Sequence, residues 1–331
     1  MKKFDIPVVM FIFKRKDTTL KIINRIKKIQ PARMYIIADA GRDKEEQKLV
    51  DECRMSVERA IDWDCEVIKN YAEQNRGVYA QIGLGALWVF ENESKAIFLE
   101  DDNLPTISFF EYCRECLNKY EKDDNIFWIC GTNYLQKCEP RNGASVFKSQ
   151  HLMPCGWASW RHKFTRYYDA ELKLAEQPNW ENKLKGKYSD RRLYLQQKRS
   201  ICAEYDKKIN GERYRSWDYH TCFSIRMQDL WGIVPKYNQI ENIGVDEFST
   251  HGGNDINLEM TKRFCGIKAY ELKEPFTLPS AEKLDVSFEK AIGRIILFPF
   301  KARLINYGRD LFRLPDNVRL RNAISYWLRK K

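Results

Sequence analysis

The stretch AIFLEDDNLPTISFF, residues Ala96–Phe110, is the part of the sequence that decides the fold. It opens with an apolar run of four residues, which is typical of a strand buried on both faces of a parallel sheet. Three acids, Glu100-Asp101-Asp102, follow that run directly. Carboxylates at the end of a buried strand cost free energy unless a cation lies among them. The stretch therefore predicts a strand that ends at a divalent metal and, through it, a nucleoside diphosphate. The simpler alternative is a strand that ends at the solvated start of the next helix.

The first 133 residues alternate between apolar runs and helix-like segments. This alternation is typical of a doubly wound α/β fold with a mostly parallel sheet. The sequence has no GxGxxG after its first apolar run and no GxxxxGK[ST], which argues against dinucleotide-binding and P-loop domains. We expect strands at Ile6–Phe13, Met34–Ala38, Cys65–Ile68, Ala96–Leu99 and Ile126–Cys130. We expect helices at Thr18–Ile29, from after Arg42 to about Ala60, at Val78–Phe90 and at Ser108–Tyr120.

Polar residues follow the expected strands in turn: Arg15, Asp39, Asn75-Arg76 and Glu100–Asp102. In an open α/β sheet the carboxyl ends of parallel strands share one edge, where ligands bind. An arginine there can fork onto phosphate oxygens, Asp39 can accept a base N–H, and the acids can hold Mg²⁺ or Mn²⁺. Each residue also has a plain alternative, such as a turn aspartate or a surface arginine. Their shared edge is what favours a nucleotide site.

The pattern changes after residue 133. Residues 134–150 look like a loop, and residues 165–215 look like a polar helical insert suited to acceptor selectivity. Between them, Trp157 and Trp160 allow two interpretations. Either they pack in the core, or they form an aromatic platform beside a sugar.

Two further residues are candidates for chemistry. Asp218 begins an apolar-periodic helix, where a carboxylate also has the structural role of complementing the helix dipole. His251 lies between small residues and before two glycines, unlike a core histidine. Neutral imidazole is a good metal ligand.

Seven segments together resemble a known family over about residues 5–255. They are FKRKDTT, IIADAGRD, NRGV, IFLEDDNLPTISFFEYC, CGWASWRHKF, SWDYHTCF and ENIGVDEFSTHGG. In this order they resemble bacterial GT-A-fold glycosyltransferases that have an EDD version of the Asp-X-Asp motif. The nucleotide half is distantly similar to the animal N-acetylglucosaminyltransferase that initiates complex N-glycans.

The resemblance implies a GT-A fold and an inverting, metal-dependent transfer from a nucleotide-sugar, with Mn²⁺ or Mg²⁺ as cofactor. It makes Asp102 the direct metal ligand. Glu100 and Asp101 would contact the ribose and the donor sugar. Arg15 and Asp39 would contact the nucleotide.

The resemblance also assigns the acids and the histidine of the second half. Asp218 matches the catalytic base, and His251 matches a histidine near the metal and pyrophosphate. The sequence departs from the family after Gly244, since Phe248 stands where relatives have a second acid. Glu247 is the weaker candidate for that role, at the acceptor.

The function that the resemblance implies is transfer of a sugar from a nucleoside-diphosphate sugar, a UDP-sugar by preference, to a glycan or lipid-linked saccharide during cell-surface polysaccharide synthesis. One alternative is a sugar nucleotidyltransferase, which would favour a Gly-rich N-terminal segment with a lysine. Phe11–Thr19 lacks such a segment. The other alternative is a non-catalytic module that binds nucleotides or glycans.

The basic residues gather at the C-terminus. Between Lys290 and Lys331 there are eleven Lys and Arg and two Asp, a net charge of +9 out of the chain's +11, so the first 289 residues carry only +2. A nearly neutral body argues against a nucleic-acid-binding protein. The tail alternates apolar and basic residues, which favours either an anionic membrane surface or a helix pair packed on the body.

We expect three parts: a nucleotide-sugar-binding half at 1–133, an acceptor and catalytic half at 134–255, and an extension at 256–331 with its basic tail at 290–331. The apolar run Ile6–Phe13 is too short for a signal peptide or a membrane span. We therefore expect a cytoplasmic protein, peripheral to the inner face of the plasma membrane if the tail binds there.

Overall fold

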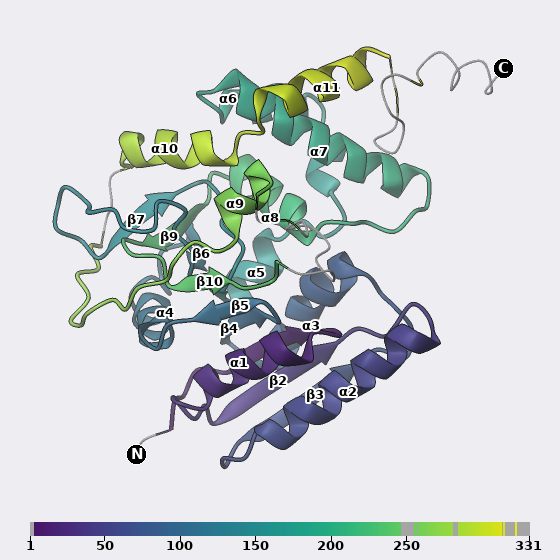
Figure 1. Cartoon of the computed structure of the whole chain (residues 1–331). Helices are drawn as coiled ribbons and strands as arrows, with labels where there is room; N and C mark the ends of the chain where they lie inside the picture. The colour runs from purple at the N-terminus through teal and green to yellow at the C-terminus, as the bar shows by residue number, and fades with distance from the viewer. Residues whose placement is uncertain are drawn as a thin grey trace.

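The computed structural model describes residues 3–245, 255, 257–280, 284–312, 314 and 322. Its centre is an eight-stranded sheet with helices on both faces (Figure 1). The strand order is β3-β2-β1-β4-β8-β6-β9-β7, and a second, two-stranded sheet pairs β10 with β5. The strands are β1 Val8–Ile12, β2 Arg33–Ala38, β3 Glu66–Tyr71, β4 Lys95–Glu100, β5 Asn103–Pro105, β6 Ile126–Cys130, β7 Val146–Ser149, β8 Trp157–Trp160, β9 Trp231–Pro235 and β10 Ile240–Asn242.

Six of the eight strands run in one direction, and β8 and β7 run against them. The predicted α/β fold with a mostly parallel sheet is therefore confirmed. Its buried strands are continuous apolar runs, as expected for strands covered on both faces. In the register of β1, Phe11 lies opposite Glu100 and Ile12 lies opposite Ala38. The carboxyl ends of β1, β2 and β4 therefore meet at one edge.

Helices form two layers around this sheet. One face is covered by α1, α2 and α4, and the other by η1, α3, α5, α8 and α10. The helices are α1 Lys16–Ile26, α2 Lys44–Ala60, the π-helix η1 Tyr79–Leu84, α3 Gly85–Asn92, α4 Ser108–Lys119, α5 Arg161–Tyr167, the 3-10 helix η2 Lys173–Glu176, α6 Trp180–Gly186, α7 Arg191–Ile209, α8 Trp217–Met227, α9 Glu259–Phe264, α10 Val286–Ile296 and α11 Phe300–Leu311.

Three local expectations differ from the structure. The helix expected at Val78–Phe90 is divided into the π-helix η1 and α3. The expected loop 134–150 contains strand β7, whose four residues pair with β9. The Trp157–Trp160 segment is strand β8, which lies between β4 and β6 in the middle of the sheet. Strands β7 and β8 have only four residues each, too few to show a period.

The helical insert has a core of its own. Leu184 of α6, Ile201 of α7 and Phe223 of α8 belong to one buried apolar cluster, separate from the two clusters on the sheet. The insert is continuous with the sheet through α8, which also packs on η1. Strands from both sides of residue 133 share the central sheet. The predicted boundary at residue 133 stays a prediction.

The C-terminal helices differ in how they pack. Phe288 and Ile292 of α10 are buried against the sheet, while α11 has no buried residue (Figure 1). Within the described ranges, every helix is too short or too polar to cross a bilayer.

Candidate functional site

Arg15 and the acids that follow β4 meet at the carboxyl edge of the sheet. Because β1 and β4 are parallel neighbours, the loops that follow them leave the sheet side by side. Arg15 Nη1 lies 3.1 Å from Asp102 Oδ2 and 3.5 Å from Asp101 Oδ1, and the Arg15 side chain is only 10% exposed. The structure thus brings together three of the residues that the sequence places at this edge.

Asp102 is enclosed by the end of β10. Its backbone oxygen accepts the N–H of Ile243 at 2.9 Å, and its Oδ1 accepts the Asn103 side-chain amide at 2.6 Å. A Cβ on Gly244 would lie 2.3 Å from Asp102 Oδ2, so only glycine leaves room for the carboxylate there. Arg15 Nη2 donates to the Gly244 carbonyl at 3.3 Å. The β10 end and the guanidinium therefore hold the Asp102 carboxylate in one place.

Carboxylates are crowded at this edge. Burial raises the pKa of Glu100 well above its ordinary value, and the carboxylates of Asp102, Asp101 and Asp218 raise it further. Burial and the Asp102 carboxylate raise the pKa of Asp101 to about 7, against the opposing effect of Arg15. Burial also raises the pKa of Asp102. A group of acids with one guanidinium among them is a favourable place for a further cation.

Asp39 organises the loop that follows β3. Its carboxylate accepts the backbone N–H of Ala40 at 2.9 Å, of Arg76 at 2.7 Å and of Gly77 at 2.9 Å. It also accepts the Asn75 side-chain amide at 3.2 Å. Asp39, Asn75 and Arg76 therefore form a second group at the carboxyl edge, and Asp39 has a positioning role that the sequence did not reveal. Contact of these three residues with a nucleotide stays a prediction.

Asp218 lies in the first turn of α8. The N-cap Ser216 accepts the backbone N–H of Tyr219 at 3.2 Å through its hydroxyl oxygen, and the same hydroxyl donates to Asp218 Oδ1. The Asp218 side chain is half-buried. A carboxylate at a helix N-terminus is stabilised in its ionised form by the N–H groups of the first turn. The Asp218 carboxylate therefore complements the dipole of α8, and its role as a base stays a prediction.

Close packing of α8 on η1 brings Asp218 toward the acids after β4. A Cβ on Gly83 of η1 would lie 3.3 Å from the Cβ of Trp217, so the two helices approach closely at this glycine. The Asp218 carboxylate contributes to the raised pKa of Glu100, which places the two carboxylates within electrostatic reach. The residue expected to be the base is thus brought near Glu100, the last residue of β4.

Sequence reasoning missed Glu204, a buried acid of α7 that fixes the segment before α8. Its Oε2 accepts the backbone N–H of Arg215 at 2.7 Å and of Ser216 at 3.4 Å. Arg213 of the same segment donates to the Asn75 carbonyl at 2.9 Å. The segment therefore connects the insert to the loop after β3. Nothing in the sequence distinguishes Glu204 from the solvated charges around it.

Glu204 makes a pH-dependent contribution to stability. Burial alone would raise its pKa, but contacts with His220, Lys207 and the Arg215 N–H lower it to about 2. A depressed pKa means that the folded state favours the ionised form, so the stabilisation is present above the ordinary glutamate pKa of about 4.3 and is lost as the pH falls toward 2. We expect Glu204→Gln to lower the free energy of unfolding by roughly 1–3 kcal/mol at pH 7 and by little near pH 2.

Thermal unfolding of both proteins between pH 3 and pH 7 measures this difference. Glu45→Gln is the matched control, because Glu45 makes an exposed ion pair with Lys48 whose loss is expected to change stability by less than about 1 kcal/mol. Equal destabilisation by Glu204→Gln at pH 3 and pH 7 would contradict the prediction.

The burial of Trp157 and Trp160 contradicts the aromatic platform. The two side chains are 1% and 0% exposed. The Trp157 ring stacks between Phe98, with centroids 3.9 Å apart, and Trp128, with centroids 4.1 Å apart. Trp160 Nε1 donates to the Leu117 carbonyl at 2.9 Å. Both tryptophans are core residues, because β8 is a central strand and not a surface loop.

The residues that the structure describes include only part of the metal site predicted from the sequence. His251 and Glu247 lie outside the described residues. In the described part of the chain, no group of three His, Cys, Asp or Glu side chains is arranged to hold a metal ion. The donor chemistry at Asp102 nonetheless suits Mg²⁺ or Mn²⁺, which take carboxylate oxygens and complete their shells with water and phosphate.

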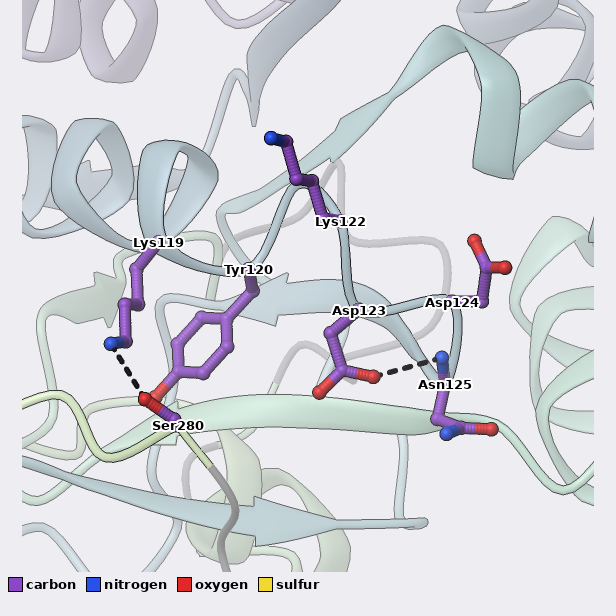
Figure 2. Close-up of a pocket in the computed structure, with 7 residues that line it drawn as sticks. All are labelled: Lys119, Tyr120, Lys122, Asp123, Asp124, Asn125 and Ser280. Atoms are coloured by element: carbon purple, nitrogen blue, oxygen red, sulfur yellow. Dashed lines mark hydrogen bonds between the residues drawn. The ribbon is translucent and has the colours of Figure 1, made fainter.

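A surface hollow of about 460 Å³ lies apart from the candidate site, between the end of α4 and the start of β6 (Figure 2). Its wall includes the loop that leads into β6, and Lys119 Nζ donates to Ser280 Oγ at 2.9 Å across one side. That loop precedes a strand that runs parallel to β4, so the hollow is at the amino edge of the sheet. It does not overlap the candidate site.

No family model and no curated protein matches the chain. Among solved structures, UDP-glucose pyrophosphorylase in complex with UDP-glucose is 10% identical, with 72% of this chain and 94% of that chain covered and a TM-score of 0.37. Mouse xyloside xylosyltransferase 1 is 11% identical, with 68% and 83% covered and a TM-score of 0.37. The bifunctional glycosyltransferase WbbM is 9% identical, with 70% and 39% covered and a TM-score of 0.30. At these identities and TM-scores, the solved structures do not assign a function to this chain.

Proposed function

We propose that this chain is a cytoplasmic, metal-dependent glycosyltransferase. It transfers a sugar, with inversion, from a UDP-sugar or related nucleotide-sugar to a glycan or lipid-linked saccharide, for cell-surface polysaccharide synthesis. The observation that supports this most is the grouping at the carboxyl edge. Arg15 contacts Asp101 and Asp102 there, and Asp218 of α8 lies close enough to Glu100 to raise the pKa of that acid.

The donor would bind across the ends of β1, β2 and β4. Arg15 would pair with phosphate oxygens, for which its planar fork is suited. The loop fixed by Asp39 would receive the nucleoside, with Asn75 and Arg76 at its rim. Asp102 would hold Mn²⁺ or Mg²⁺, and a bound divalent ion there supplies charge neutralisation for the leaving diphosphate.

Asp218 would act as the general base. Its carboxylate takes the proton from an acceptor hydroxyl as that oxygen forms a bond to the anomeric carbon. The bond between the anomeric carbon and the diphosphate oxygen breaks on the opposite face, and the diphosphate leaves with the electron pair. Because one displacement occurs, the configuration at the anomeric carbon inverts. Glu100 and Asp101 would orient the donor beside this centre.

A ligand screen tests the proposal. Thermal unfolding would be followed with UDP, GDP, CDP, ADP and dTDP, each with Mn²⁺ and with a chelator. We expect one diphosphate to stabilise the protein only when Mn²⁺ is present, by about 2.7 kcal/mol at a ligand concentration of 100 times Kd.

The matching nucleotide-sugar should then be hydrolysed slowly without an acceptor. Stabilisation by a nucleoside triphosphate, with synthesis of a nucleotide-sugar from a sugar phosphate, would identify a nucleotidyltransferase. Stabilisation without turnover in any mixture would identify a binding module.

A further inference from the structure

Helix α11, Phe300–Leu311, presents an apolar stripe to solvent. Phe300, Leu304, Tyr307 and Leu311 follow the spacing i, i+4, i+7 and i+11, which places them on one side of a helix. Their residues are 70%, 58%, 67% and 66% exposed. Scattered exposed apolar residues are ordinary, but four large ones aligned on one helix indicate a surface that meets something apolar.

The helix is attached to the insert in a defined way. Asp310 of α11 pairs with Arg199 of α7. Just before α11, Gln196 donates to the Ile296 carbonyl at 3.1 Å and accepts the Phe298 N–H at 2.8 Å. Figure 1 shows α11 near α7 at the outside of the molecule, away from the sheet. These contacts join α11 and the segment before it to α7.

The neighbouring helix α10 is packed instead on the body. The Phe288 ring stacks on Phe147 of β7 with centroids 4.0 Å apart, and Glu289 accepts the Gln150 N–H at 3.1 Å. The two alternatives for the basic tail thus apply to different helices. Packing on the body accounts for α10, and it does not account for α11.

Charge indicates what the stripe meets. Lys301 and Arg303 flank it on the helix, and Asp310, the acid of α11, is already paired with Arg199. The sequence that follows, from Arg313 to Lys331, adds six basic residues and one acid. Basic residues beside an apolar stripe complement an anionic lipid bilayer, where aromatic and aliphatic side chains enter the boundary between headgroups and acyl chains.

We propose that α11 docks on an anionic membrane surface through Phe300, Leu304, Tyr307 and Leu311, with Lys301 and Arg303 at the level of the lipid phosphates. This inference does not depend on the transfer reaction, because it concerns lipid binding by the protein without donor or acceptor.

Vesicle co-sedimentation of the full chain tests it. The probes are vesicles of pure phosphatidylcholine and vesicles with about a third phosphatidylglycerol, a content chosen to give a clearly negative surface. We expect the protein to bind only the anionic vesicles. The double variant Leu304→Glu, Leu311→Glu should bind at least 10-fold more weakly, and Lys301→Gln with Arg303→Gln should lose most of the dependence on phosphatidylglycerol.

Met55→Glu is the matched control, since Met55 is 53% exposed on α2 and belongs to no such stripe. It should bind like the wild type. Thermal unfolding of each variant shows that it is folded. Unchanged binding by the Leu304 and Leu311 variant would overturn the proposal. A concentration-dependent dimer that forms in the wild type and is lost in this variant would also overturn the proposal, because the stripe would then be covered by a second copy of the chain.

Discussion

Replacing Asp218 with asparagine is expected to reduce sugar transfer by about 100- to 10,000-fold, the usual contribution of a general base. The asparagine side chain has the same shape and can still accept the Ser216 hydroxyl, so the start of α8 should stay intact. It has no ionised oxygen to take a proton from the acceptor. Because Asp218 would not contact the diphosphate, the affinity for nucleoside diphosphate with Mn²⁺ should equal that of the wild type. Initial rates at saturating donor and calorimetric titration measure the two quantities.

Asp229→Asn is the control for this substitution. Asp229 lies just beyond the other end of α8 and pairs with Lys187 at the surface. Its φ of 55° is in the left-handed region, which asparagine tolerates well. The control should keep the wild-type rate. A wild-type rate for Asp218→Asn would exclude Asp218 as the base, whereas loss of diphosphate binding would show that the acid serves the donor instead.

The sequence predicts the parallel part of the sheet well because each buried strand is a run of apolar residues. The run at Ala96–Leu99 lies within β4, and the acids after it mark the carboxyl edge. The antiparallel strands β7 and β8 were missed for a physical reason. Each has four residues, and Trp157 looks the same in a sequence whether its ring stacks on Phe98 or lies at a surface. Only pairing partners far along the chain decide between the two.

The candidate site also has residues that the sequence predicts and residues that it does not. Arg15 and Asp102 could be placed together, because parallel strands bring their loops to one edge. Three of the four N–H groups bound by Asp39 could not be predicted, since they come from a loop more than thirty residues away. No sequence pattern indicates the role of Glu204, because that role depends on burial against a segment that precedes α8. Residues placed by the strand that they follow are predictable, and residues whose role depends on tertiary contacts are not.

Replacing Asp102 with asparagine is expected to abolish the effect of Mn²⁺ on nucleoside diphosphate binding. The amide keeps the shape that fits against Gly244 and can still accept from Arg15, but it is a neutral and much weaker ligand for a hard divalent ion. Loss of even a supporting contact in a metal site costs about 10- to 100-fold in affinity, so loss of the direct ligand should cost more than about 100-fold. Titration of the diphosphate with Mn²⁺ and with a chelator, in wild type and variant, measures the loss.

The unfolding temperature of the variant distinguishes loss of the metal ligand from loss of the folded structure. The edge would hold two crowded carboxylates, Glu100 and Asp101, instead of three, so Asp102→Asn should unfold at a temperature no lower than the wild type. Glu93→Gln is the contrasting control. Glu93 is buried at the opposite, amino edge, where it accepts from Arg33 and Tyr35 at 2.7 Å. That variant should unfold at a lower temperature and keep Mn²⁺-dependent binding. If Asp102→Asn kept that binding too, the metal would have to be held by other residues, and the acidic strand end would be a structural feature of the sheet alone.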